Sequence, residues 1–276
     1  MNKIRRGNRE GSRLFGYLMV VPATLLLVVV SIIPLLDGVY LAFTNTNLNT
    51  GADAWVGIQN FVEIFQDSKF YQVFGFTILY AFAVVLFSYI LGMLIALLLN
   101  QDIRFRGVFR AIILAPWVVP PVVATITWSW LLNDKVGLIN TVLQNIGMIQ
   151  EPIYFLSDLT LVKGTVIAFG VWKSYPFMMI TLLAGMQSID GVLYEAAKID
   201  GAGKVKAFFH ITMPMMKNVS FVCTILMFIW TINNFENIYL MTQGGPLDST
   251  MILSILTYNS AFFRGQIGIR LRYSIW

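Results

Sequence analysis

The chain has 276 residues, of which 57% are hydrophobic and only 12% are charged. Soluble domains carry about 25% charged residues, so this composition argues against a soluble globular protein and indicates a membrane protein. The net charge of +5 is attributed to membrane topology rather than to nucleic-acid binding, and one cysteine and one histidine leave neither an internal disulfide nor a histidine-rich metal site.

The N-terminal part predicts a basic tail and a first membrane span. Residues 1–13 carry five basic side chains, and the apolar run 14–36 is longer than the core of a signal peptide, which has about 7–15 residues. We therefore expect an uncleaved span, kinked at Pro22 and Pro34. The polar residues 44–70 are expected to form an external loop.

The second and third spans are expected at residues 71–99 and 108–132. Pro116 and the Pro120-Pro121 pair interrupt the third, so its helix is expected to be broken or bent. A membrane tolerates such a break where the helix lines a cavity or packs inside protein. Residues 133–161 are expected to form a second external loop.

The fourth span, residues 162–186, contains an ionisable residue in an apolar run, Lys173. Such a group costs about 2.5–3.5 kcal/mol at a helix centre and usually faces the interior of the helix bundle. Together with its neighbours Trp172 and Tyr175 it is a candidate for the substrate pathway. The aromatic side chains have a commoner alternative role, which is packing.

A polar segment of small residues, 190–214, follows the fourth span. Asp190 is placed to cap a short helix of good helix formers that extends to Ile199, and Gly201 supplies the flexible position where that helix stops. A second short helix precedes Pro214, which redirects the chain. Its apolar face is expected to consist of Val205, Phe208 and Phe209. Such a surface suits docking into a groove of another protein.

The fifth span, residues 219–240, carries amides within its apolar sequence. At helical spacing, one face would hold Trp230, Asn233, Asn234 and Asn237. Amides bind sugar hydroxyls and an aromatic ring stacks on a sugar face, so this face is a second candidate for the pathway; interhelical hydrogen bonding is the alternative. Glu236 is expected either to pair with Lys173 or to face water. Residues 241–265 are expected outside the membrane.

The distribution of basic residues predicts the orientation. The first two external loops hold two, Lys69 and Lys135, whereas the segments expected in the cytoplasm hold twelve: Lys3, Arg5, Arg6, Arg9, Arg13, Arg104, Arg106, Arg110, Lys198, Lys204, Lys206 and Lys217. Cytoplasmic loops of membrane proteins are enriched in Lys and Arg. The N-terminal tail and segment 190–214 are therefore expected in the cytoplasm.

Segment 190–214 also carries a spaced motif: Glu-Ala-Ala, three residues, Gly, nine residues, Ile-x-Leu-Pro, with Met213 in place of the leucine. This spacing resembles the cytoplasmic coupling loop of binding-protein-dependent ABC importer permeases. The triplet Asp200-Gly201-Ala202 and the run 234–246 look like the carbohydrate branch of that family. The resemblance assigns the coupling role to Glu195, Ala196, Ala197, Asp200, Gly201, Ala202, Phe208, Ile211 and Pro214.

The resemblance implies a permease subunit of an ATP-driven sugar importer in a bacterial or archaeal cytoplasmic membrane, with residues 14–265 as its transmembrane domain. It implies four kinds of partner: a second, homologous permease, two ATPase subunits, an extracytoplasmic sugar-binding protein and the lipid bilayer. The sequence has no phosphate-binding Gly-x-x-x-x-Gly-Lys-Ser/Thr loop. We therefore expect no catalytic residue, no metal and no cofactor on this chain, with ATP-Mg on the partner ATPase.

Two other classes of protein compete with this interpretation. A secondary sugar transporter driven by an ion gradient would have inverted repeats with paired broken helices, whereas one span here is clearly interrupted. A membrane component of a sugar phosphotransferase would need a phosphoryl acceptor, and the single histidine, His210, lies in segment 190–214. The identity of the sugar stays open.

The C-terminal tail departs from the family that the chain resembles, whose members finish with a sixth span. Residues 266–276, at 1.5 Å each in a helix, are too few to cross a core of about 30 Å, and they include Arg270 and Arg272. We therefore expect an all-α membrane protein with five spans and the sixth missing or truncated. A frameshift near Gly268 is one hypothesis, which resequencing of the gene tests.

Overall fold

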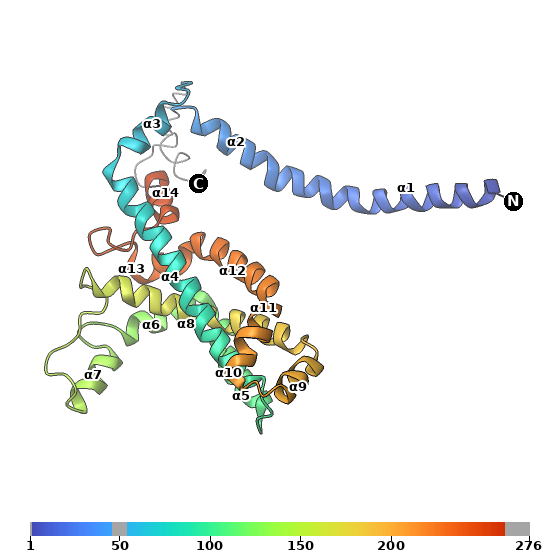
Figure 1. Cartoon of the computed structure of the whole chain (residues 1–276). Coiled ribbons are helices and arrows are strands. Elements are labelled where there is room, and N and C mark those ends of the chain that lie inside the picture. Colours follow the sequence, from blue (N-terminus) through green and yellow to red (C-terminus); the bar gives the residue numbers. More distant parts are fainter. Residues whose placement is uncertain (1, 46–53, 263–276) are drawn as a thin grey trace. The chain divides into compact units, whose positions relative to one another are not determined.

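The computed structural model describes residues 2–45 and 54–262. These residues form helices joined by short connections, with one isolated antiparallel bridge between Thr44 and Trp55 (Figure 1). The chain divides into two compact units, residues 1–68 with 257–276, and residues 69–256. The predicted all-helical fold is confirmed for the described residues.

The first unit contains one long apolar helix that changes its winding before a proline. Helix α1 (Asn2–Leu27), the π-helical turn η1 (Val28–Ile32) and α2 (Ile33–Ala42) follow without interruption. Pro34 has no N–H to donate to the carbonyl of Val30. The wider π-helical turn accommodates the proline without interrupting the helix. The helix passes through Pro22 as well, and its residues Phe15–Ala42 form a candidate span.

The buried side-chain amide of Asn60 contacts the end of α2. Helix α3 (Gln59–Gln66) occupies part of the expected loop 44–70. From it, Asn60 donates from Nδ2 to the carbonyl oxygens of Ala42 at 2.8 Å and Thr44 at 3.0 Å, and it is only 5% exposed. These bonds satisfy carbonyl groups at the end of α2 and hold the start of α3 against that end.

A core of the second unit is formed by α4 (Ser68–Leu99), α8 (Leu161–Gln187) and α12 (Lys217–Ile232). Helices α4 and α8 cross, as Figure 1 shows. The two helices approach closely at Gly92, where a Cβ atom would lie 2.7 Å from Cβ of Met178. Small residues permit such close packing between membrane helices. The buried methionines of this core are Met93, Met178, Met179, Met186, Met216 and Met227.

The third predicted span is broken. Helices α5 (Arg106–Val118) and α6 (Pro121–Leu131) meet at 90° at the Pro120-Pro121 pair, which confirms the prediction of a broken helix. Helix α7 (Leu138–Asn145) lies in the expected external loop 133–161. That loop is therefore partly helical.

The remaining helices alternate between short and long. They are α9 (Gly191–Ile199), α10 (Lys204–Ala207), the π-helical turn η2 (Phe208–Thr212), α11 (Met213–Met215), α12 (Lys217–Ile232), α13 (Phe235–Thr242) and α14 (Leu253–Phe262). The chain bends by 66° between α10–α11 and α12. The expected continuous span 219–240 is wrong in one respect: its helix is interrupted between α12 and α13.

Part of the expected external segment 241–265 is packed against the protein. Residues 249–253 are buried, and Ile252 is completely inaccessible. The backbone N–H of Leu253, where α14 begins, donates to Oγ1 of Thr77 on α4 at 3.0 Å. This part of the segment therefore packs against α4, because its apolar side chains find a protein surface there.

Three described helices are long and apolar enough to cross a membrane, and five spans result when each of two bent pairs is counted as one. The bent pairs are α5 with α6 and α10–α11 with α12. The prediction of five spans is therefore within the range that the structure supports. The predicted atypical tail, residues 266–276, lies outside the described residues.

Candidate functional site

Helix α9 begins with the predicted cap. Oδ1 of Asp190 accepts a hydrogen bond from the backbone N–H of Val192 at 3.0 Å. The helix then presents an exposed surface that includes Glu195 and Ala196, while Ala197 is half-buried. An apolar side chain, Ile199, is 87% exposed at its end. This short helix therefore leaves apolar and acidic groups exposed, outside the core of its own chain.

Gly201 ends α9 in a left-handed turn. Its φ is +74°, its N–H donates to the carbonyl of Lys198 at 3.1 Å, and the N–H of Ala202 donates to the carbonyl of Ala197 at 2.8 Å. This pair of bonds is a Schellman motif, which satisfies the last carbonyls of a helix. A Cβ at Gly201 would meet no atom within 4 Å, so glycine is required here by backbone conformation and not by lack of space.

The second short helix winds through a π-helical turn before Pro214. Pro214 has no N–H for the carbonyl of His210, and the turn η2 spans that position, as η1 does before Pro34. Hydroxyl groups of Tyr194 and Thr212 are 2.9 Å apart and join α9 to η2. The two short helices are therefore held together by a partly buried hydrogen bond.

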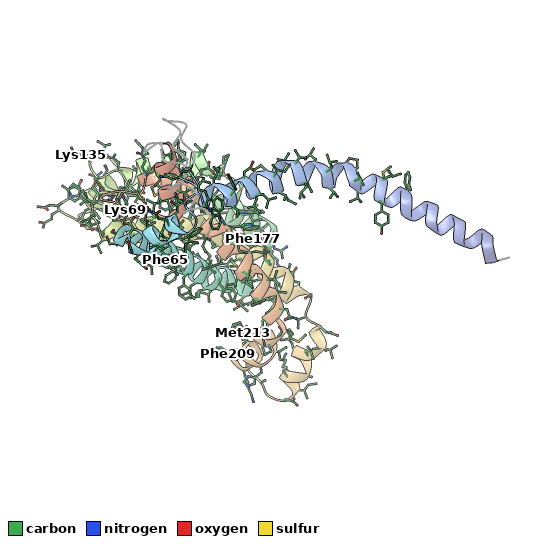
Figure 2. All side chains as sticks on the ribbon, turned by 90° about the horizontal axis from the view of Figure 1, so that it is seen from above. Phe65, Lys69, Lys135, Phe177, Phe209 and Met213 are labelled. Carbon is green, nitrogen blue, oxygen red and sulfur yellow. The ribbon has the colours of Figure 1, made fainter. Side chains whose placement is uncertain are left out.

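The predicted apolar face of the second helix is partly packed against the core and partly exposed. Phe208 packs against the core, whereas Val205 and Phe209 are 72% and 61% exposed. Met213, near Phe209 on the same segment (Figure 2), also contacts the core, so the methionine in the motif position acts as an apolar anchor. The rings of Phe208 and Phe209 nevertheless contact each other, with centroids 5.0 Å apart, and all three predicted side chains line one groove.

A groove of about 580 Å³ lies beside these helices, next to the C-terminal end of α4. It is lined by Leu97, Asn100, Gln101, Met186, Tyr194, Lys204, Val205, Ala207, Phe208, Phe209 and Thr212. The coupling residues Glu195, Ala196 and Gly201 are not among its lining residues. The sequence interpretation did not include Asn100 and Gln101, although their position directly after an apolar span was a signal.

Lys173 reaches from α8 to the break between α5 and α6. Its Nζ donates to the carbonyl oxygen of Pro116 at 2.7 Å and to that of Val119, and the side chain is only 9% exposed. The carbonyl of Pro116 would be bonded by residue 120 in a continuous helix, but Pro120 has no N–H. The ammonium group thus satisfies carbonyls at the C-terminal end of α5, where the helix dipole also favours a positive charge.

The aromatic residues predicted for the substrate pathway do not all gather at one place. Trp172 packs with Trp128, their ring centroids 5.2 Å apart, and both Trp172 and Tyr175 line an apolar groove of about 690 Å³ between α4 and α8. The hydroxyl of Tyr175 donates to the carbonyl of Ile113 at 3.1 Å. Trp230 lies elsewhere and packs on Phe177 of α8, which Figure 2 labels, with ring centroids 5.0 Å apart.

The predicted amide face on the fifth span does not form. Asn233 ends α12 and is exposed, whereas Asn234 has ψ of 81° and caps α13, with its Oδ1 accepting from the N–H of Asn237 at 3.3 Å. Asn237 itself is 6% exposed, and its side-chain oxygen has no partner. The helix breaks between the amides, because Asn234 uses its side chain as a helix cap.

Glu236 lies in the first turn of α13 and is exposed, which is where a helix dipole favours an acid. Both Glu236 and Lys173 belong to the described part of the chain, and they form no ion pair within 4.0 Å. Of the two alternatives for Glu236, exposure is the one that the structure shows.

The described residues thus form a helical, multi-pass membrane protein. Residues 88–265 match the family of binding-protein-dependent transport system inner membrane components. The chain belongs to this family of permeases. Membership assigns it to importers that work with a binding protein and not to transporters driven by ion gradients, and it marks the chain as a transport subunit in the cell membrane rather than an enzyme.

Relatives with stated substrates match almost the whole chain. The trehalose/maltose transport system permease protein MalF of Thermococcus litoralis is 35% identical over 94% of this chain and 87% of that protein. The sulfoquinovosyl glycerol transport system permease protein SmoG of Agrobacterium fabrum is 32% identical over 91% and 81%. The chain also has the fold of a bacterial ABC transporter that imports alginate, with a TM-score of 0.85, 23% identity and coverage of 98% and 92%.

Proposed function

We propose that the chain is the permease subunit of an ATP-driven importer that carries a sugar or oligosaccharide into the cytoplasm. The relatives named for trehalose and maltose and for sulfoquinovosyl glycerol support a carbohydrate substrate. A second, homologous permease, two ATPase subunits with ATP-Mg and an extracytoplasmic sugar-binding protein complete the assembly. The N-terminus and segment 190–214 lie in the cytoplasm, in agreement with the distribution of basic residues.

The observation that carries the coupling role is the exposed helix α9 and its glycine turn. Two short helices joined by the Tyr194–Thr212 hydrogen bond project acidic and apolar groups outward, and Phe208 anchors them to the core. A rigid, partly exposed element of this kind suits docking into a groove of the ATPase. Movement of that ATPase would reach α12 through α11.

The substrate pathway is proposed to involve the sequence candidates that remain accessible. Trp230, Asn233 and Glu236 are exposed, and they lie around the junction of α12 and α13. Amide, carboxylate and indole groups are suited to a sugar, because they combine hydrogen bonding with an apolar face. Trp172, Tyr175, Lys173 and Asn237 would contribute indirectly, by holding α5, α6, α8 and α13 in place through the packing and hydrogen bonds described above.

The coupling proposal is tested by Gly201→Val in the reconstituted importer. Valine is strained at a φ of +74°, so the turn is expected to shift and transport to fall by about tenfold or more, while membrane insertion persists. The measurements are sugar uptake and sugar-stimulated ATP hydrolysis.

Gly203→Val is the matched control. Gly203 also has no atom within 4 Å of an added Cβ, but its φ is −70°, which valine adopts readily. Wild-type uptake and ATPase stimulation in Gly201→Val would contradict the coupling role. Uptake that proceeds without ATP would contradict the whole proposed function.

A further inference from the structure

Two arginines converge on one amide at the junction of α5 and α8. Arg106 and Arg110 are one turn apart on α5, and Gln187 is the last residue of α8. With the amide oxygen of Gln187 facing α5, it accepts hydrogen bonds from Nη2 of Arg106 at 2.5 Å and from Nη2 of Arg110 at 2.9 Å. Two positive charges therefore share one neutral acceptor.

The positive charge of this cluster is not balanced by the protein. Within the described part of the chain, the ion pair found joins Lys69 to Asp248, and neither arginine is paired with a carboxylate. Nε of Arg106 and Nε of Arg110 are buried without a hydrogen-bond partner. The first turn of α5 has no acidic residue, so the positive end of its dipole adds to the two like charges. The cluster is suited to an anion.

The surface around the cluster is apolar. On α8, Ile180 and Ala184 are exposed and lie on the same face as Gln187, seven and three residues before it. A small cavity of about 100 Å³ between the helices is lined by Arg110, Leu114, Met179, Ile180, Leu183, Ala184 and Gln187. A soluble anion would leave this apolar surface uncovered, whereas a phospholipid supplies an anionic headgroup and hydrocarbon chains in one molecule. Basic pockets between membrane helices bind such headgroups.

We propose that Arg106, Arg110 and Gln187 form a binding site for the headgroup of an anionic phospholipid in the cytoplasmic leaflet. The choice of leaflet rests on the proposed orientation of the chain. The bound phosphate takes hydrogen bonds from the guanidinium groups, and the lipid chains lie along the apolar side chains at the junction of α5 and α8. The lipid ties the start of α5 to the end of α8, directly beside Met186, which lines the groove at the coupling helices.

The test uses the assembled importer in nanodiscs of phosphatidylcholine with increasing phosphatidylglycerol. Lipid retention is measured by native mass spectrometry and thermal stability by unfolding of the same sample. Each basic group near an anionic surface strengthens binding by about fivefold, so Arg106→Gln with Arg110→Gln is expected to weaken phosphatidylglycerol binding by about 30-fold. The control is Lys135→Gln with Lys163→Gln. It removes the same amount of charge from the loop before α8 and from the opposite end of that helix, and it is expected to change phosphatidylglycerol binding by less than about twofold.

Gln187→Glu keeps the test decisive if the double arginine variant does not fold. The change is nearly isosteric and supplies a carboxylate between the two guanidinium groups, so the variant is expected to be more stable in pure phosphatidylcholine and to lose its preference for phosphatidylglycerol. A preference equal to that of the wild type would overturn the proposal.

Two further outcomes would overturn the proposal in favour of another anion. Inorganic phosphate that stabilises the importer in phosphatidylcholine as much as phosphatidylglycerol does would identify a site for a free anion. Loss of ATPase subunits from the arginine variant, with unchanged lipid binding, would identify a contact with a partner protein.

Discussion

Helices α8 and α5–α6 both contain proline, yet only one of them breaks. Helix α8 continues for 27 residues through Pro176, and α5 likewise contains Pro116, whereas the chain turns by 90° at Pro120 and Pro121. A single proline removes one hydrogen bond, which the rest of a long helix can absorb. Two successive prolines remove two, and they also force the preceding Val119 into an extended conformation, with ψ of 130°.

The unbroken helix stabilises the broken one. Lys173 of α8 lies three residues before Pro176 and donates to the carbonyl groups of Pro116 and Val119 at the break. A broken helix is tolerated within a membrane where neighbouring groups satisfy its backbone. The comparison therefore shows that the bend depends on two contributions, the proline pair and a cation from another helix, and each can be removed separately.

The largest effect is expected from Lys173→Met, which preserves the length of the side chain and removes its charge. Two carbonyl groups at the break would lose their partner, and the free energy of unfolding should fall by about 3 kcal/mol. Thermal unfolding of the purified protein and sugar uptake measure the change. Lys163→Met, on the same helix but outside the break, is the control. Unchanged stability in Lys173→Met would show that the bend does not need the cation.

A smaller effect is expected from Pro120→Ala combined with Pro121→Ala. The two restored N–H groups allow α5 to continue, because an interior proline costs a helix about 3 kcal/mol, and uptake should fall by about tenfold as the bend is lost. Pro176→Ala makes the same chemical change in a helix that is already continuous. It should alter uptake by less than about twofold, and an equal loss in both variants would contradict the distinction between the helices.

The junction of α12 and α13 extends the comparison to a helix that breaks without proline. Asn234→Ala removes the cap of α13 and should reduce the free energy of unfolding by about 1 kcal/mol. Asn233→Ala changes an exposed amide and should alter stability by less than about 0.5 kcal/mol. If Asn233 contacts the sugar, this second variant should lose uptake per inserted molecule; normal uptake with several oligosaccharides would exclude that contact.

The smallest effect is expected at the start of α8. The backbone N–H groups of Leu161 and, secondarily, Thr160 donate to Oδ1 of Asp158 at 2.8 and 2.9 Å and lower the pKa of this exposed carboxyl. A lowered pKa in the folded state gives stability that is present at neutral pH and is lost as the pH falls below about 4. Asp158→Asn should therefore unfold at a slightly lower temperature than the wild type at pH 7, and the difference should shrink as the pH falls through the lowered pKa of Asp158.

Unfolding midpoints across this pH range test the prediction at Asp158. Asp102→Asn, at an exposed position after α4, is the control for the loss of one negative charge. A difference between wild type and Asp158→Asn that stays constant down to about pH 3 would show that the carboxylate does not stabilise the start of α8.

The local features of this protein were predictable from sequence because their causes are local. Asp190 caps α9 with its own side chain, Gly201 ends that helix in the conformation that glycine adopts most easily, and Pro120-Pro121 break a helix by the hydrogen bonds they lack. The long apolar runs likewise indicated membrane helices, because a span is defined by length and hydropathy.

Tertiary structure decided the features that depend on distant residues. Nothing near Lys173 in sequence indicates that its charge serves carbonyl groups more than 50 residues earlier, and the helical spacing of Asn233, Asn234 and Asn237 wrongly predicted one continuous face. The shared contact of Arg106 and Arg110 with Gln187, and the buried Nε atoms that it leaves without a partner, likewise became visible only in the tertiary structure. A periodic pattern assumes an unbroken helix, whereas the choice between an intrahelical bond, a cap and a partner on another helix is made by the free energy of the whole packed structure.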